Sequence, residues 1–144
     1  MIDQIVEPQF GLIFFMLFGR ESVSNIVQHH YEVEHGNPAL PNQVIIYDLT
    51  QGEVEISLED LYKNNELNKA EFDKKGHLSR TALVSKSSVI NIMAQTVNMF
   101  NKDMPIKLES FTTLADAVWW LGLSAHLPEI EKMREEMIHR NISA

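Results

Sequence analysis

Several polar residues lie at the predicted ends of strands, where their side chains could bind an anion. Lys86 stands just before a predicted helix start, so its ammonium group and the first free amides could hold a phosphate or a carboxylate. Helix-start serines are also ordinary capping residues, and the loop has no glycine-rich phosphate cradle. The candidate ligand-binding residues are Arg20, Asp48, Ser85, Lys86 and Ser88.

The histidines of the first predicted helix are candidate metal ligands. His29 and His30 are consecutive, so their side chains diverge along the helix, and His30 falls on the same stripe as Val23 and Ile26. His30 and Glu34 are four residues apart, but no His-x-x-x-His pair or second acidic group completes three or four ligands. We therefore expect structural or solvated histidines, no metal site and no cofactor.

Motifs for nucleophilic catalysis are missing from the sequence. The chain has no cysteine, and it contains no G-x-S-x-G segment. Asp48 with a histidine and a serine could form a triad only if tertiary structure brought them together. We expect that the protein is not an enzyme, and a small hydrolase is the weakest of the alternatives.

Strands and helices alternate along the chain after an opening hairpin. Strands are predicted at 2–6, 11–18, 43–49, 80–85 and 106–111, with the first and last near the edges of the sheet. Helices are predicted at 22–35, from 58 to the low seventies, from 88 to Met104-Pro105, from 113 through the tryptophans, and from 128 to about 140. This alternation is typical of one α/β domain with a mostly parallel sheet.

Apolar spacing also predicts the buried face of each helix. On the second helix the residues expected to face inward are Leu58, Leu61, Tyr62 and Phe72. On the third helix they are Val89, Ile92, Met93, Thr96 and Phe100.

The two adjacent tryptophans cannot share one helix face, since neighbours point about 100° apart. A helical projection places Ala117, Val118 and Leu121 toward the core, with Trp120 on its flank. Trp119 and Leu123 project away from the sheet, which predicts a cover or a partner.

The segment 124–144 offers such a cover. It carries an apolar stripe with a charged opposite face, and short helices of this kind need packing to be stable. We expect it to pack on the domain or on a second subunit, with an interaction surface formed by Trp119, Leu123, Ile130, Met133 and Met137.

Composition limits the classes of partner. The 144 residues carry a formal net charge of −8, which disfavours nucleic-acid binding and attachment to anionic membranes. No apolar run is long enough to span a bilayer, and the acidic start is unlike a signal peptide. These features predict a cytoplasmic protein.

Three segments in a particular order carry a family resemblance: VIIYDLTQ before ISLEDL, then RTALVSKSSVINIMAQTVNMF, then IKLESFTTLADAVWWLGL. Together they resemble the small bacterial SpoIIAA-like proteins, which are relatives of STAS domains. Ala117 and Trp120-Leu121 match the alanine and the late Trp-Leu pair in the last helix of that family. The resemblance covers residues 1–123, and 124–144 would be a C-terminal helical extension.

The resemblance implies a mixed sheet of four or five strands flanked by helices. It also implies a non-catalytic regulatory or protein-interaction module, here a homodimer that senses a small ligand at the carboxyl ends of the strands. The family's phosphorylated Asp-Ser-Ser-Gly motif is absent, and Ser57 is only a hydroxyl at a helix start. The alternative is a carrier of a small lipid or apolar ligand. A closed pocket of several hundred Å³ near Phe14, Met93 or Met99 would favour the carrier.

Overall fold

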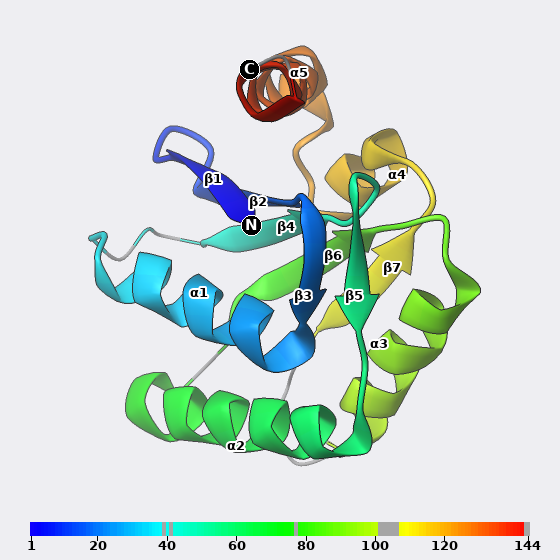
Figure 1. The fold of residues 1–144 in the computed structure, drawn as a ribbon. Helices are drawn as coiled ribbons and strands as arrows, with labels where there is room; N and C mark the ends of the chain where they lie inside the picture. Colours follow the sequence, from blue (N-terminus) through cyan, green and yellow to red (C-terminus); the bar gives the residue numbers. More distant parts are fainter. Residues whose placement is uncertain (39, 41, 77, 101–106, 143–144) are drawn as a thin grey trace.

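The chain is built around a five-stranded sheet in the order β1–β2–β4–β6–β7 (Figure 1). This computed structural model describes residues 1–144 except 39, 41, 77, 101–106 and 143–144. The strands are β1 (Ile2–Glu7), β2 (Leu12–Leu17), β4 (Val44–Asp48), β6 (Arg80–Val84) and β7 (Leu108–Phe111). The β1–β2 hairpin is antiparallel and the other pairings are parallel, which confirms the predicted mixed α/β sheet.

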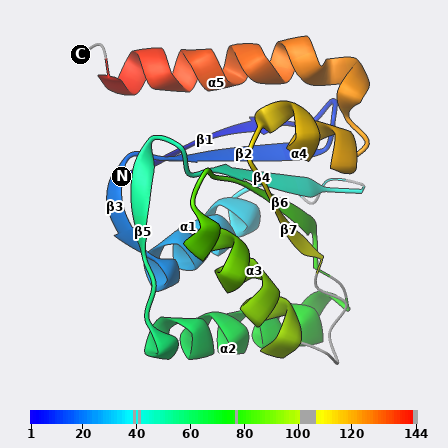
Figure 2. The same cartoon turned by 90° about the vertical axis from the view of Figure 1, so that its right-hand side faces the viewer.

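Helices cover both faces of this sheet (Figure 2). One face carries α1 (Val23–His35), α2 (Leu58–Lys75) and α3 (Ser88–Phe100). The other carries α4 (Leu114–Trp120), a short 3₁₀ turn and α5 (Leu127–Ile142). The crossovers β2–α1–β4, β4–α2–β6 and β6–α3–β7 all step the same way, so their helices share one face.

A second sheet pairs β3 (Gly19–Ser22) with β5 (Gly52–Glu55) in parallel. Neither strand was predicted from the sequence, because these short charged segments lack apolar alternation. Gly52 permits the approach of the two strands. A Cβ at this position would lie 2.7 Å from the Gly19 carbonyl oxygen and 2.8 Å from the Leu17 side chain.

Hydroxyl side chains cap the starts of α1, α2 and α4. Ser22, Ser57 and Thr113 each accept a hydrogen bond from a backbone amide three residues later. Gly76 ends α2 with a φ of 78°, a conformation that glycine adopts without strain. The predicted stop at Met104-Pro105 and the predicted strand start at 106 fall outside the described residues.

The buried faces of α2 and α3 agree with the prediction at Leu61 and Met93 and differ from it at other positions. On α3 the buried residues are Ile90, Ala94 and Val97, whereas Val89 and Ile92 are exposed. This helix is apolar on several sides, so periodicity alone could not choose the face that meets the sheet. On α2 the buried residues are Leu61, Asn64 and Glu71, and the predicted Leu58 and Tyr62 face solvent.

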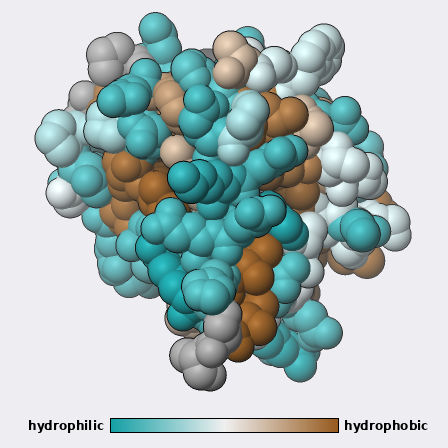
Figure 3. Space-filling model, turned by 90° about the horizontal axis from the view of Figure 1, so that it is seen from above, coloured by the Kyte–Doolittle hydropathy of each residue, from teal (hydrophilic) through white to brown (hydrophobic). Residues whose placement is uncertain are grey.

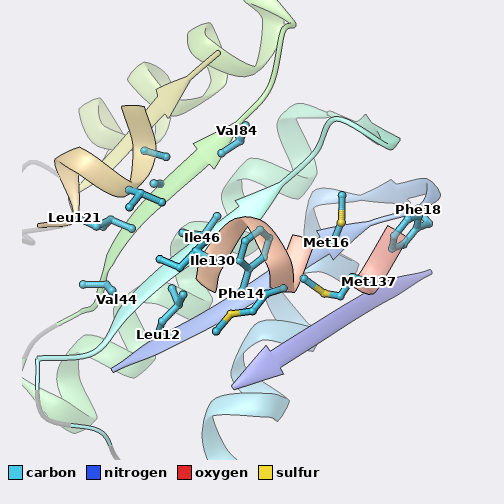
Figure 4. Packing of buried hydrophobic residues seen from close by; sticks show 14 residues of the cluster. Leu12, Phe14, Met16, Phe18, Val44, Ile46, Val84, Leu121, Ile130 and Met137 are labelled. Carbon is cyan, nitrogen blue, oxygen red and sulfur yellow. The ribbon is translucent and has the colours of Figure 1, made fainter. Parts of the chain in front are cut away.

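Helix α5 lies across the sheet of its own chain, above β1 and β2 (Figures 1 and 2). Ile130, Met133 and Met137 are buried there against Phe14 and neighbouring strand residues (Figure 4). Of the two predicted alternatives, the domain and a second subunit, the sheet of the same chain receives these three residues, and they do not reach Trp119. From above, the middle of this side of the molecule is largely hydrophilic, with hydrophobic patches beside it (Figure 3).

The tryptophans separate as the helical projection required, but α5 does not cover Trp119, which is 72% exposed. Trp120 packs on Phe111, and the Arg80 guanidinium lies 4.7 Å above its ring. Leu123 packs against the core instead of facing away. The helix ends at Trp120 and the chain reverses at Gly122, so the helical projection does not extend to Leu123.

Among the described residues, none of the helices combines the length and apolarity needed to cross a bilayer.

Candidate functional site

An open cleft of about 620 Å³ lies where the predicted ligand site was expected, at the carboxyl ends of β4 and β6. The structure brings Ser85 and Lys86 together in this strand-end cleft, beside Thr50. Ser88 follows at the start of α3, and Arg20 does not line the cleft. Arg20 lies on β3, where its Nε is 2.6 Å from Oε1 of Glu55 on β5.

Asp48 is fully buried and its carboxylate is already occupied. Arg134 of α5 donates from Nε to Oδ2 over 2.7 Å, and Thr50 donates its amide and hydroxyl to Oδ1. Arg134 also donates to the Thr50 hydroxyl oxygen. The aspartate therefore anchors α5 to the end of β4, and it has no free oxygen directed toward a ligand.

The charges around the strand-end cleft do not favour an anion. Glu131 and Glu135 of α5 line it together with Lys86, and Arg134 is already paired with Asp48. The sheet order also lacks a reversal among the described strands, so the crevice that doubly wound sheets offer to ligands is not formed here.

A second hollow lies on the opposite face, between the sheet and the helices α1, α2 and α3. This helix-side cavity measures about 110 Å³ and is partly open to solvent. Most of its lining is apolar: Val23, Ile26, Val27, Leu49, Val54, Leu78, Leu83, Met93, Val97 and Leu108. Apolar lining with a few polar groups is the usual composition of a small-molecule pocket.

Three polar side chains form a buried chain at one end of this cavity. The Tyr47 hydroxyl bonds to Nδ1 of His30, and Nε2 of His30 lies 3.4 Å from Oε1 of Glu34. Burial raises the pKa of Tyr47 well above its usual value, with smaller contributions from the charges of nearby acidic groups. A phenol that stays protonated can donate to Nδ1, which leaves the imidazole proton on Nε2, facing Glu34.

Glu34 has several partners although its side chain is almost fully buried. Burial disfavours its charged form, but the neighbouring His30 and Lys75 outweigh burial and lower its pKa to about 2. Gln43 donates to Oε1 over 2.5 Å and Lys75 lies 3.3 Å from Oε2. Lys75 also lies 3.1 Å from Glu71.

Further polar contacts on this face join α1 to α2. Ser24 donates to Asp60 over 2.8 Å, and Tyr31 donates to Asn68 over 2.6 Å. His35 lies 3.0 Å from both carboxylate oxygens of Glu71. Because α2 buries little apolar surface, these contacts hold it over the cavity.

Within the described ranges, no group of three or more histidine, aspartate or glutamate side chains is placed to hold a metal ion. Asp48 also makes no contact with a histidine among its hydrogen bonds, so the triad considered from sequence is not assembled around it.

A pocket near Met93 was predicted only for the carrier alternative, and none of the polar residues at its end was named as a site residue. The one local sequence signal for the polar end of this cavity was the pair His30/Glu34, spaced four residues apart on an apolar stripe. Tyr47 and Lys75 come from β4 and the end of α2, so only the folded chain places them beside this pair.

Comparisons with known proteins give similarity at the level of structure. No family model matches the sequence, and no curated protein matches it. The crystal structure of an uncharacterised protein from the DUF3478 family, with a SpoIIAA-like fold, from Shewanella loihica PV-4, is similar with a TM-score of 0.54 and 17% identity. That similarity covers 83% of this chain and 93% of the other.

The anti-sigma factor antagonist SpoIIAA in its unphosphorylated form is also similar, with a TM-score of 0.45 and 15% identity over 82% of this chain and 94% of that one. At these identities the comparisons report on fold alone. The similarity to the DUF3478 structure, together with the strand order and the helices on both faces, shows that the chain has a SpoIIAA-like fold.

Proposed function

We propose that this protein is a non-catalytic regulatory module that binds a small molecule in the helix-side cavity and presents an exposed surface to a protein partner. The cavity carries the first part of this proposal. It is partly enclosed, mainly apolar, and has an ordered group of polar side chains at one end. These are the features of a ligand pocket.

The size of the cavity favours sensing of a small molecule over carriage of a lipid. A carrier was expected to have a closed pocket of several hundred Å³, and this cavity measures about 110 Å³. Met93 lines it as anticipated, whereas Phe14 belongs to the core on the opposite face of the sheet.

Exposed apolar side chains support the second part of the proposal. Trp119 faces solvent on α4, and Val89, Ile92 and Met99 form a stripe along the outer side of α3. Apolar residues grouped in this way commonly mark protein interfaces. A homodimer, with the stripe and Trp119 as contacts, is the form that we propose for this surface.

Toluene is a suitable probe of the cavity because it is apolar and small. We expect it to shift the NMR signals of Met93, Leu83 and Val97, and to leave those of Leu12 and Met137 on the other face unchanged. Substituting Val27→Phe should fill the cavity and abolish the shifts.

The matched control is Gln28→Phe, which adds the same ring on the exposed side of α1. It should leave the toluene shifts intact, and thermal unfolding of both variants establishes that they fold. Shifts that spread over both faces, or that survive Val27→Phe, would argue against a ligand site in this cavity.

Native mass spectrometry tests the interaction surface. We expect the unsubstituted protein to be a dimer. The variants Trp119→Glu and Ile92→Glu should dissociate it, whereas Lys132→Glu should not. A monomer at all concentrations would remove the homodimer from the proposal, and a heterologous partner would then have to occupy the surface.

A further inference from the structure

The polar end of the helix-side cavity carries charges of both signs, and the contacts among them decide which ligands can enter. Glu34 faces His30, Gln43 and Lys75. Glu71 faces His35 and the same Lys75. Each of these ionised groups therefore already has an oppositely charged or hydrogen-bonded partner inside the protein.

Most of the uncharged polar groups around the cavity are also engaged, and an exception is Nε2 of His30, which faces Glu34 over 3.4 Å without a hydrogen bond. Tyr31 donates to Asn68, and the amide of Asn68 contacts Asn64. The Ser79 hydroxyl oxygen accepts from Gln43, and its carbonyl accepts from Thr81. The polar lining therefore hydrogen-bonds mostly within itself, and it does not direct a charge into the cavity to pair with a ligand.

An ionised ligand would have to leave water for this cavity without an available counter-charge. A carboxylate or phosphate would approach the ionised Glu34, and an ammonium group would approach Lys75. Burying a charge without a partner is far more costly than burying a hydroxyl or a ring.

The volume limits the size of the ligand. An apolar cavity of about 150 Å³ accommodates benzene in another protein. This cavity is smaller, at about 110 Å³, but it is partly open to solvent, so a molecule of about one small ring or a short aliphatic chain can enter with one end at the opening.

We infer that the helix-side cavity selects small, uncharged, mainly apolar molecules and excludes ionised acids and amines of the same size. The inference rests on the proposed function and adds the chemical class of the ligand.

Four probes with one common ring separate the possibilities at pH 7: toluene, benzyl alcohol, benzoate and benzylamine. Dissociation constants come from NMR titration of the Met93 and Leu83 signals. We expect toluene and benzyl alcohol to bind, and benzoate and benzylamine to bind at least tenfold more weakly than benzyl alcohol. The Val27→Phe variant should remove binding of all four.

Two failures are distinguishable in this experiment. If benzoate or benzylamine binds as tightly as benzyl alcohol, the selectivity for uncharged molecules is wrong and the cavity remains a ligand site. If none of the four probes shifts the signals, the proposed function fails, and the inference fails with it.

A charge variant tests the reason for the selectivity. Lys75→Met removes the ammonium group beside Glu34, so this carboxylate gains the capacity to pair with a cation. Benzylamine affinity should then rise at least tenfold, with less than a threefold change for benzyl alcohol. Lys69→Met, an exposed lysine on the same helix, should change neither affinity. Equal behaviour of the two variants would overturn the argument from paired charges.

Discussion

The two faces of the central sheet differ in how their helices are held. On one face α5 contributes Ile130, Met133 and Met137 to a continuous apolar cluster, and Arg134 fixes its middle to the buried Asp48. Its end is fixed by Arg140, which donates from two nitrogens to the Asp3 carboxylate. This face is a packed core closed by a helix with apolar and ionic anchors.

On the opposite face α2 buries only Leu61, Asn64 and Glu71, and a cavity remains between it and the sheet. Its contacts with α1 are mainly polar side-chain pairs. The same strands supply apolar residues to both faces, so the difference lies in the helices. A helix with an apolar stripe fills the space above the sheet, whereas a polar helix leaves a hollow that a ligand can use.

The largest effect is expected where this packing is tightest. Ile130→Ala should lower the free energy of unfolding by about 2–5 kcal/mol, because it removes a fully buried side chain and leaves a cavity. Leu61→Ala on α2 should lower the free energy of unfolding by less than Ile130→Ala, since Leu61 lies outside both apolar clusters. Urea denaturation of both variants measures the difference, and an equal or larger loss at Leu61 would contradict the contrast between the faces.

The ionic anchor of α5 comes next. Asp48→Asn should lower the free energy of unfolding by about 3 kcal/mol. This is near the lower end of the loss expected when one partner of a buried ion pair is removed, because Arg134 retains some contact with water. The double variant with Arg134→Met should recover part of this loss. If the double variant is as unstable as the sum of the two single variants, the pair does not act as a unit.

The polar network of the other face predicts a dependence on acid. The pKa of Glu34 is lowered to about 2, so its stabilising contribution is present above the unfolded value near 4.5 and is lost as the pH falls toward 2. Glu34→Gln should be less stable by up to about 3 kcal/mol at pH 6, and the gap should close near pH 2. Urea denaturation between pH 6 and pH 2 measures this difference in stability, with Glu32→Gln as the exposed control. A difference between Glu34→Gln and the unsubstituted protein that does not change with pH would contradict the prediction.

The smallest effect is expected at Trp119. For the monomer, at protein concentrations where the proposed dimer has dissociated, Trp119→Phe should change the free energy of unfolding by less than about 0.5 kcal/mol, because the side chain is exposed. The emission that remains, from Trp120 alone, should shift to the blue because Trp120 is partly buried against Phe111. Trp120→Phe should leave red-shifted emission. The reverse assignment of the two spectra would show that Trp119 is covered in solution.

The sequence predicted the fold well where apolar residues recur with a clear period. The buried strands, the opening hairpin and the stripe of α1 with Val23 and Ile26 are as expected. Prediction failed for β3 and β5, which are held by pairing between distant polar segments. It also failed for α3, where several apolar faces compete and only contact with the sheet selects Ile90 and Ala94.

The candidate site shows the same limit more sharply. Asp48 was correctly placed at a strand end, but the sequence could not reveal that Arg134, 86 residues later, would occupy its carboxylate. The cavity depends on how little α2 buries, and on polar side chains that three separate elements bring together. No local pattern contains that information.

The sequence by itself determined the alternation of strands and helices, the presence of hydroxyl side chains at the helix starts, and the separation of the two tryptophans, because these depend on residues within a few positions of one another. Tertiary structure decided which face of each helix is buried, where α5 lies, and which face of the sheet keeps a cavity. Those outcomes depend on competition among distant apolar and charged groups for the same space, and that competition is resolved only when the whole chain packs.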